Sequence, residues 1–146
     1  GSVNAMVPGT YTVTYTAIDA AGNTVSVVRT VTVVDTKPPV VTAVATPNVL
    51  LWSPNKTMTP VTISGKVSDL RLATVTYTVQ DEYRLIQPSG TVSVGANGAY
   101  AFVVRLEAFR NGTDSNGRVY TVIVKATDAA GNVATASTVV LVPHNK

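Results

Sequence analysis

The feature that most constrains the fold of this 146-residue chain is an internal repeat. Residues 11–35 read YTVTYTAIDAAGNTVSVVRTVTVVD, and residues 120–144 read YTVIVKATDAAGNVATASTVVLVPH. Eleven of the 25 aligned positions are identical, including the string D-A-A-G-N at Asp19–Asn23 and at Asp128–Asn132. One supersecondary unit, with a turn signal between two apolar runs, is therefore used twice.

Each copy predicts a β-hairpin. Apolar residues alternate with polar ones on both sides of the turn, which is the period-2 pattern of a strand with one buried face. Aspartate accepts hydrogen bonds from amides two residues ahead, and glycine supplies the positive φ of a tight turn. The tyrosine that opens each copy stands where a tyrosine corner closes the end of a β-sandwich. We expect structural roles for Tyr11, Asp19, Gly22, Asn23, Tyr120, Asp128, Gly131 and Asn132.

The composition also favours strands. The chain has 28 Val and 22 Thr, so these two β-branched types alone make up 34% of its residues, and only 13% of the residues are charged. Such side chains pack well on a pleated surface and poorly in helices, which argues against helical bundles and α/β enzymes. No Lys/Arg cluster supports nucleic-acid binding, and no apolar run reaches the roughly 20 residues needed to cross a membrane.

Two consecutive prolines divide the chain. The sequence DTKPP at 35–39 predicts a stiff linker at 37–39, because proline donates no ladder hydrogen bond and holds the chain extended. Residues 1–36 are then a partial domain and residues 40–146 a complete one. In the second part, alternation and turn signals predict strands at 40–46, 59–68, 73–81, 90–94, 99–107, 118–127 and 133–142. This spacing predicts an all-β fold, an antiparallel immunoglobulin-like sandwich of about seven strands.

Two segments resemble bacterial immunoglobulin-like (Ig-like) modules. GSVN at 1–4 and VPGTYTVTYTAIDAAGN at 7–23 resemble the C-terminal half of the Ig-like repeat named after an insecticidal crystal protein. The stretch from Thr46 through WSPNKTM at 52–58 to the second D-A-A-G-N resembles a second exported bacterial Ig-like module. The resemblance implies an extracellular or cell-surface location and neighbouring Ig-like domains in one chain.

The residues give little support for catalysis. With one histidine, His144, near the end of the sequence and no cysteine, neither a nucleophile–histidine pair nor a zinc site is expected. Asp81 and Glu82 are neighbours on a strand and should point to opposite faces, so they do not form a carboxylate dyad. Glu107 is expected to make an exposed ion pair with Arg105 or Arg110. We predict no enzyme activity and no cofactor.

Two ligand candidates stay open. The loop at 111–117 fails the EF-hand pattern. Asp114 and Asn116 with backbone carbonyls could form a looser calcium site, and the alternative is an ordinary polar loop. Trp52, the only tryptophan, could stack on a sugar ring. The alternative is that it forms a lid that closes one end of the core.

The predicted function is that of a non-catalytic structural or adhesion module that acts as a spacer or presenting domain. One alternative is a filament subunit, in which the first hairpin pairs with other copies by β-strand addition. Another is a sandwich that binds surface glycan.

Overall fold

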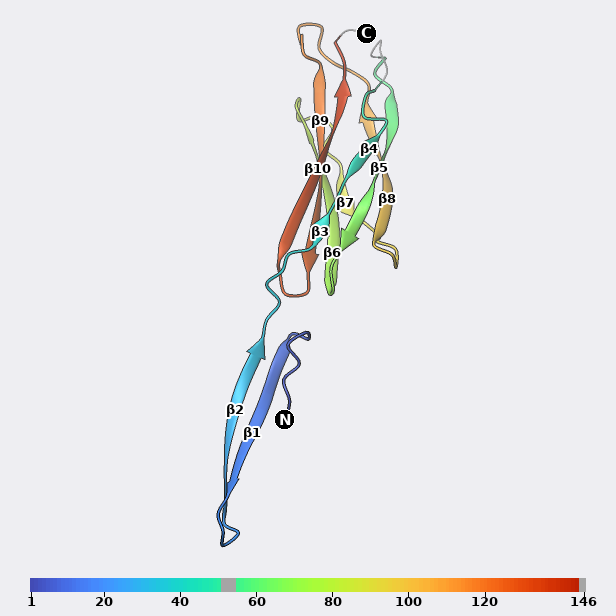
Figure 1. Cartoon of the computed structure of the whole chain (residues 1–146). Helices are drawn as coiled ribbons and strands as arrows, with labels where there is room; N and C mark the ends of the chain where they lie inside the picture. Colours follow the sequence, from blue (N-terminus) through green and yellow to red (C-terminus); the bar gives the residue numbers. More distant parts are fainter. Residues whose placement is uncertain (51–54, 145–146) are drawn as a thin grey trace. The chain divides into compact units, whose positions relative to one another are not determined.

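A computed structural model describes residues 1–50 and 55–144 of the chain (Figure 1). It contains ten β-strands in the described residues, and no helix there is long and apolar enough to span a membrane. The chain forms two compact units, Gly1–Lys37 and Pro38–Lys146, and each is described by itself. The strands are β1 Gly9–Ile18, β2 Thr24–Val33, β3 Val40–Val41, β4 Val44–Thr46, β5 Met58–Ser68, β6 Leu72–Asp81, β7 Ser89–Thr91, β8 Ala99–Glu107, β9 Arg118–Asp128 and β10 Val133–Val142.

The first unit is a two-stranded antiparallel hairpin of β1 and β2. Its register sets Tyr11 opposite Val31 and Tyr15 opposite Val27. Because side chains alternate across a strand, these residues share one face, and the threonines of β1 lie on the other. The apolar face is largely open in this unit, since Tyr15 is 55% exposed and Val27 is 63% exposed.

The second unit is a sandwich of two antiparallel sheets. One sheet has the strand order β10-β9-β6-β7. In the other, β5 pairs with β8 along one edge and with the short strands β3 and β4 along the opposite edge. The all-β, Ig-like sandwich predicted from the sequence is confirmed.

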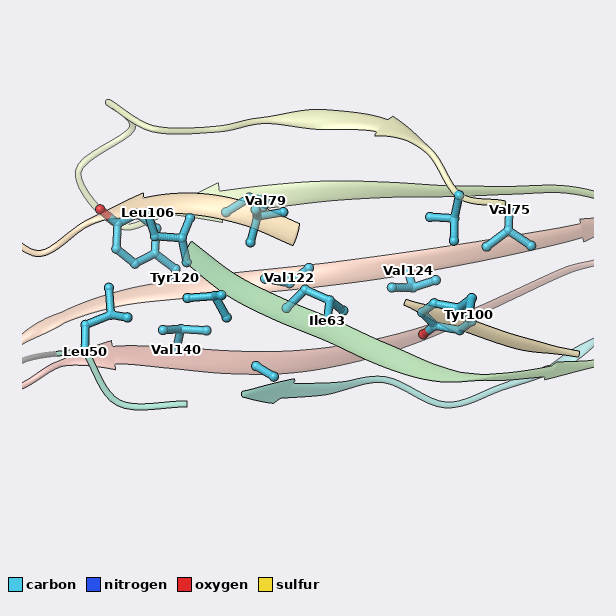
Figure 2. Packing of buried hydrophobic residues seen from close by; sticks show 14 of the residues in the cluster. Leu50, Ile63, Val75, Val79, Tyr100, Leu106, Tyr120, Val122, Val124 and Val140 are labelled. Atoms are coloured by element: carbon cyan, nitrogen blue, oxygen red, sulfur yellow. The ribbon is translucent and has the colours of Figure 1, made fainter. Parts of the chain in front are cut away.

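The core of the sandwich lies between its two sheets, as Figure 2 shows for the close packing of Ile63, Val122 and Val140. It is built from the inward positions that the alternation predicted, and these side chains are almost completely removed from water. The fully buried apolar residues include Val61, Ile63, Leu106, Tyr120, Val122, Val124, Ala126, Val140 and Val142.

The predicted strand at 40–46 is divided into β3 and β4, and the division depends on Gly65 of the neighbouring strand β5. At the break, the amide of Thr42 donates to the carbonyl of Lys66 at 2.9 Å, and the Tyr100 hydroxyl donates to the carbonyl of Thr42. A Cβ on Gly65 would lie 1.9 Å from that same carbonyl oxygen. The backbone of Thr42 can come this close only because residue 65 has no side chain.

A short segment beyond β4 crosses to the other sheet. Between the predicted strands at 40–46 and 59–68, Val49 forms a parallel bridge with Leu141 of β10. The amide of Leu50 donates to Leu141 at 2.8 Å, and the amide of Leu141 donates to Asn48 at 2.9 Å. Leu50 is 2% exposed, so this segment also covers one end of the core.

We predict that Gly65→Ala destabilises the sandwich by about 1–3 kcal/mol, the usual cost of forcing extra volume into a packed site. The new methyl would meet the Thr42 carbonyl and the Tyr100 hydroxyl. Urea denaturation followed by circular dichroism measures the change. Gly112→Ala is the matched control, because a Cβ at Gly112 has no neighbour within 4 Å. Equal stability of the two variants would contradict the prediction.

Candidate functional site

The most elaborate polar arrangement in the second unit is centred on Arg118, the first residue of β9, which is completely buried. Its Nε donates to Asp81 Oδ1 at 2.8 Å, and its Nη2 donates to Asp81 Oδ2 at 2.6 Å. Its Nη1 donates to Glu107 Oε2 and to the carbonyl oxygen of Phe109, both at 3.0 Å. The bidentate geometry with Asp81 is the strong form of an arginine–carboxylate contact.

Asp81 is held from its other side by the loop that follows β6. Its Oδ2 accepts hydrogen bonds from the amides of Leu85 at 2.8 Å and Ile86 at 2.9 Å, and its Oδ1 accepts one from the amide of Tyr83 at 3.1 Å. Burial by itself would raise the pKa of this carboxyl group. The Arg118 guanidinium and the three amides outweigh burial and lower the pKa to about 2.

Two tyrosine rings enclose the guanidinium. Its central carbon lies 4.7 Å from the ring centroids of both Tyr83 and Tyr120, within the range of cation–π contacts. The Tyr120 hydroxyl donates to the carbonyl of Glu107 at 3.0 Å, and the Tyr83 hydroxyl donates to Asp114 Oδ2. Burial raises the pKa of Tyr120, which keeps this hydroxyl a donor.

Arg118 is not among the residues predicted from the sequence, and the predicted ion pair of Glu107 with Arg105 or Arg110 is wrong, because Glu107 binds Arg118. Arg105 points outward on β8 and is exposed, while Arg110 donates to the carbonyls of Pro143 at 3.1 Å and His144 at 2.8 Å. The alternation carried the missing signal, because Arg118 stands two positions before the inward Tyr120 and shares its face. Asp81 does lie inside the sandwich, at 4% exposed.

The two D-A-A-G-N turns have the same hydrogen-bond pattern. In the first turn, Asp19 Oδ1 accepts from the amides of Ala21 at 2.9 Å and Asn23 at 2.8 Å, and Oδ2 accepts from Asn23 Nδ2 at 2.7 Å. Gly22 has a φ of 86°. The Asn23 side chain and the neighbouring amides lower the pKa of Asp19.

The second turn repeats each contact. Asp128 Oδ1 accepts from the amides of Ala130 at 2.9 Å and Asn132 at 2.8 Å, and Oδ2 accepts from Asn132 Nδ2 at 2.8 Å. Gly131 has a φ of 92°. Burial opposes ionisation of Asp128, but the hydrogen bonds from Asn132 and the amides outweigh it and lower its pKa. Both aspartates use their carboxylates to close their own turns.

The two tyrosines that open the repeats differ in their acceptors. The Tyr11 hydroxyl donates to the carbonyl of Val7 at 2.7 Å, four residues earlier in the chain. The Tyr120 hydroxyl instead reaches the end of β8, across the loop of residues 108–117. Only the second contact joins two strands that come from opposite sheets.

The sequence suggested two ligand candidates, the loop residues Asp114 and Asn116 and the tryptophan Trp52. Both carboxylate oxygens of Asp114 accept from protein donors, Oδ1 from the amide of Gly117 at 3.1 Å and Oδ2 from Tyr83, and Asn116 is exposed. Within residues 1–50 and 55–144, no group of three or more His, Cys, Asp or Glu side chains is arranged to hold a metal ion. Trp52, the candidate glycan contact, lies outside the described residues.

Comparison with known proteins bears on the first unit. Residues 1–33 match the family model described as "Bacterial surface protein, Ig-like domain". The hairpin of the first unit is therefore similar in sequence to bacterial surface Ig-like domains. This match confirms the resemblance of the N-terminal segment to bacterial Ig-like domains. It is consistent with a surface or extracellular location and with neighbouring domains in a larger chain.

A solved structure also resembles the chain. It comes from work on the host cell surface retention of a 1.5-MDa bacterial ice-binding adhesin, and it is 24% identical with a TM-score of 0.42. The match covers 94% of this chain and 42% of that one, so the chain spans less than half the length of the solved structure. Among curated protein sequences, no match was found.

We predict that Arg118→Met destabilises the second unit by about 3–5 kcal/mol, because it leaves a buried carboxylate without its counter-charge. The double variant Asp81→Leu/Arg118→Leu should lose less, since the two fully buried charges are removed together and only the partly exposed Glu107 and the loop amides lose a partner. Urea denaturation of the three proteins measures the difference. If the double variant is as unstable as the single one, the unpaired charge is not the cause.

Acid should weaken the same site. The folded-state pKa of Asp81, about 2, lies below its ordinary value of 3.8, so ionised Asp81 favours the folded state above that value. This contribution, roughly 2 kcal/mol, is lost as the pH falls from about 4 to about 2. Denaturation curves at neutral and acid pH test this, and Asp81→Leu/Arg118→Leu should lose less stability in acid than wild type. In the second unit, the remaining acid loss should reflect Asp128, whose pKa is also lowered.

Proposed function

We propose that the chain is a non-catalytic spacer from a larger exported bacterial surface protein, with the second unit transmitting force along its length. The Ig-like match of residues 1–33 supports the surface location. The path of the chain through the second unit supports the mechanical role. The buried polar groups also fit this role, because in the described residues each buried side-chain nitrogen or oxygen has a hydrogen-bond partner.

The observation that carries the proposal is that the chain enters and leaves the second unit at opposite ends. It enters at Val40, which pairs with Ser68 at the end of β5. It leaves after Val142, which pairs with Arg118 beside Glu107, and Glu107 pairs with Met58 at the start of β5. The full length of β5 therefore separates the entry from the exit, and tension on the chain acts along the strands.

Tension in this direction loads the contact between residues 48–50 and β10. The two segments run parallel, and two backbone hydrogen bonds join them through Leu141. Pulling the two ends of the unit apart slides these segments past each other, so both hydrogen bonds must break together and not in sequence. The Thr138 hydroxyl adds a contact to the same entry segment, because it accepts from the amide of Ala45 at 3.2 Å.

For the first unit, we propose that β1 and β2 are the last hairpin of a separate Ig-like sandwich. The repeat aligns each residue of β1–β2 with the residue 109 positions later in β9–β10. In the second unit these positions pack against β5 and β8 across the core. An isolated two-stranded hairpin is marginally stable in water, so its apolar face needs a covering sheet. Neighbouring strands of the parent chain would supply that sheet.

We predict that Leu141→Pro lowers the force needed to unfold the second unit in single-molecule stretching of the full chain. Proline removes the amide that donates to Asn48, at an equilibrium cost of about 1 kcal/mol, and β10 is an edge strand where proline is tolerated.

Two variants control for the other effects of this change. Leu141→Ala shortens the side chain but keeps the amide. Val139→Pro places proline two residues earlier, where the amide again points away from β9. Both should unfold at a higher force than Leu141→Pro. If Leu141→Pro loses equilibrium stability yet unfolds at the wild-type force, tension does not pass through this contact.

A further inference from the structure

The two hairpins of the repeat have similar inward faces, which raises the question of whether they can be exchanged. Tyr11, Val13 and Ala17 of β1 have the same residue types as Tyr120, Val122 and Ala126 of β9. Val31 and Val33 of β2 match Val140 and Val142 of β10 in the same way. All five residues of the second hairpin are completely buried.

Exchange of such elements between copies is a general hazard for repeated domains. In one copy, β1–β2 presents an open apolar face, and in another copy the sheets of the second unit offer the surface that β9–β10 covers. The strand register would also fit, because β1 could pair with β6 in the register that β9 has now. Thr14, for example, would stand opposite Thr78, where Ile123 stands now.

At one inward position the second hairpin carries a charge that the first hairpin lacks. The residue of β1 that corresponds to Arg118 is Gly9. With β1 in the place of β9, Asp81 would lose both of its arginine hydrogen bonds, and Glu107 would lose its ion pair. Asp81 is 4% exposed and is held in place by three loop amides, so it could not turn toward water. A buried carboxylate without a counter-charge is among the most costly defects of a protein core.

We propose that the Arg118–Asp81 ion pair decides which hairpin completes the second unit: it admits β9–β10 and excludes β1–β2 of a neighbouring copy. This inference rests on the proposed origin of β1–β2 as the last hairpin of an Ig-like sandwich. It also defines the chemistry of the sheets that β1–β2 does fit. They are Ig-type sheets with no buried carboxylate at the place of Asp81, since Gly9 brings no charge there.

Further inward positions also differ, and two of them oppose exchange most strongly. Tyr15 corresponds to Val124, which is completely buried, and a larger ring there would overpack the core. Arg29 corresponds to Thr138, whose hydroxyl accepts from the amide of Ala45. A test of the ion pair must remove these two differences first. Gly9 itself can accept a side chain, because a Cβ there would meet only the Tyr11 ring, at 3.9 Å.

The experiment transfers the arginine from one hairpin to the other in the full chain. The background carries Tyr15→Val, Arg29→Thr and Arg118→Gly, with Thr14→Cys and Thr78→Cys as reporters in a protein that has no natural cysteine. Directly opposed positions of antiparallel strands lie within disulfide reach, so these cysteines join two copies only when β1 occupies the place of β9. The background is compared with and without Gly9→Arg.

We expect a disulfide-linked dimer, seen on non-reducing gels and by light scattering, only when Gly9→Arg is present. If Arg118→Gly alone unfolds the second unit, Gly9→Arg should restore both the strand signal in circular dichroism and the cross-link. Thr78→Cys/Ile123→Cys in the otherwise wild-type chain is the geometric control and should cross-link within one copy, because the structure sets these residues opposite each other.

Three results would overturn the proposal. One is a cross-link of equal yield with and without Gly9→Arg. Another is a background that neither folds nor cross-links after Gly9→Arg is added. The last is a cross-link between Thr14→Cys and Thr78→Cys in a chain that is otherwise wild type. None of these results depends on the unfolding force, so the mechanical proposal stands or fails separately.

Discussion

The second unit depends on the environment of one buried cation. Arg118 belongs to β9 in one sheet, and its guanidinium binds Asp81 in that sheet and Glu107 of β8 in the other. It thereby joins the two layers at the end of the sandwich where the chain leaves. Buried ion pairs often add little net stability, because the cost of removing both charges from water offsets their attraction. Their value lies in specificity, since few alternative arrangements can satisfy both charges.

The loops at this end are arranged by the same requirement. The amides of Tyr83, Leu85 and Ile86 turn toward Asp81, which fixes the loop after β6. The Tyr83 ring then covers the guanidinium, and its hydroxyl reaches Asp114 in the loop before β9. Asp114, which the sequence suggested as a calcium ligand, is thus engaged with the loop that surrounds Arg118. Its role in the described structure is to connect two loops.

The fold could be read from the sequence because its information is local. Alternation along the chain gave the inward residues of β5, β8 and β9, and the D-A-A-G-N string gave both hairpin turns. The Arg118–Asp81 pair could not be found in the same way, because its members are 37 residues apart and only strand pairing brings them together. The break at Thr42 was missed for a similar reason, since it depends on the close approach of Gly65 from another strand.

The two hairpins show how little of a β-hairpin's stability lies within it. Both have the same closed turn, the same register of cross-strand pairs around it and a similar apolar face. In β9–β10 that face is covered and its valines are buried, whereas in β1–β2 Tyr15 and Val27 stay exposed. Similar sequence therefore gives the same local structure in both places, and the covering sheet decides burial. In an array of related domains, the covering sheets must differ enough that each hairpin completes its own sandwich, and a charge that only one hairpin can neutralise provides that difference.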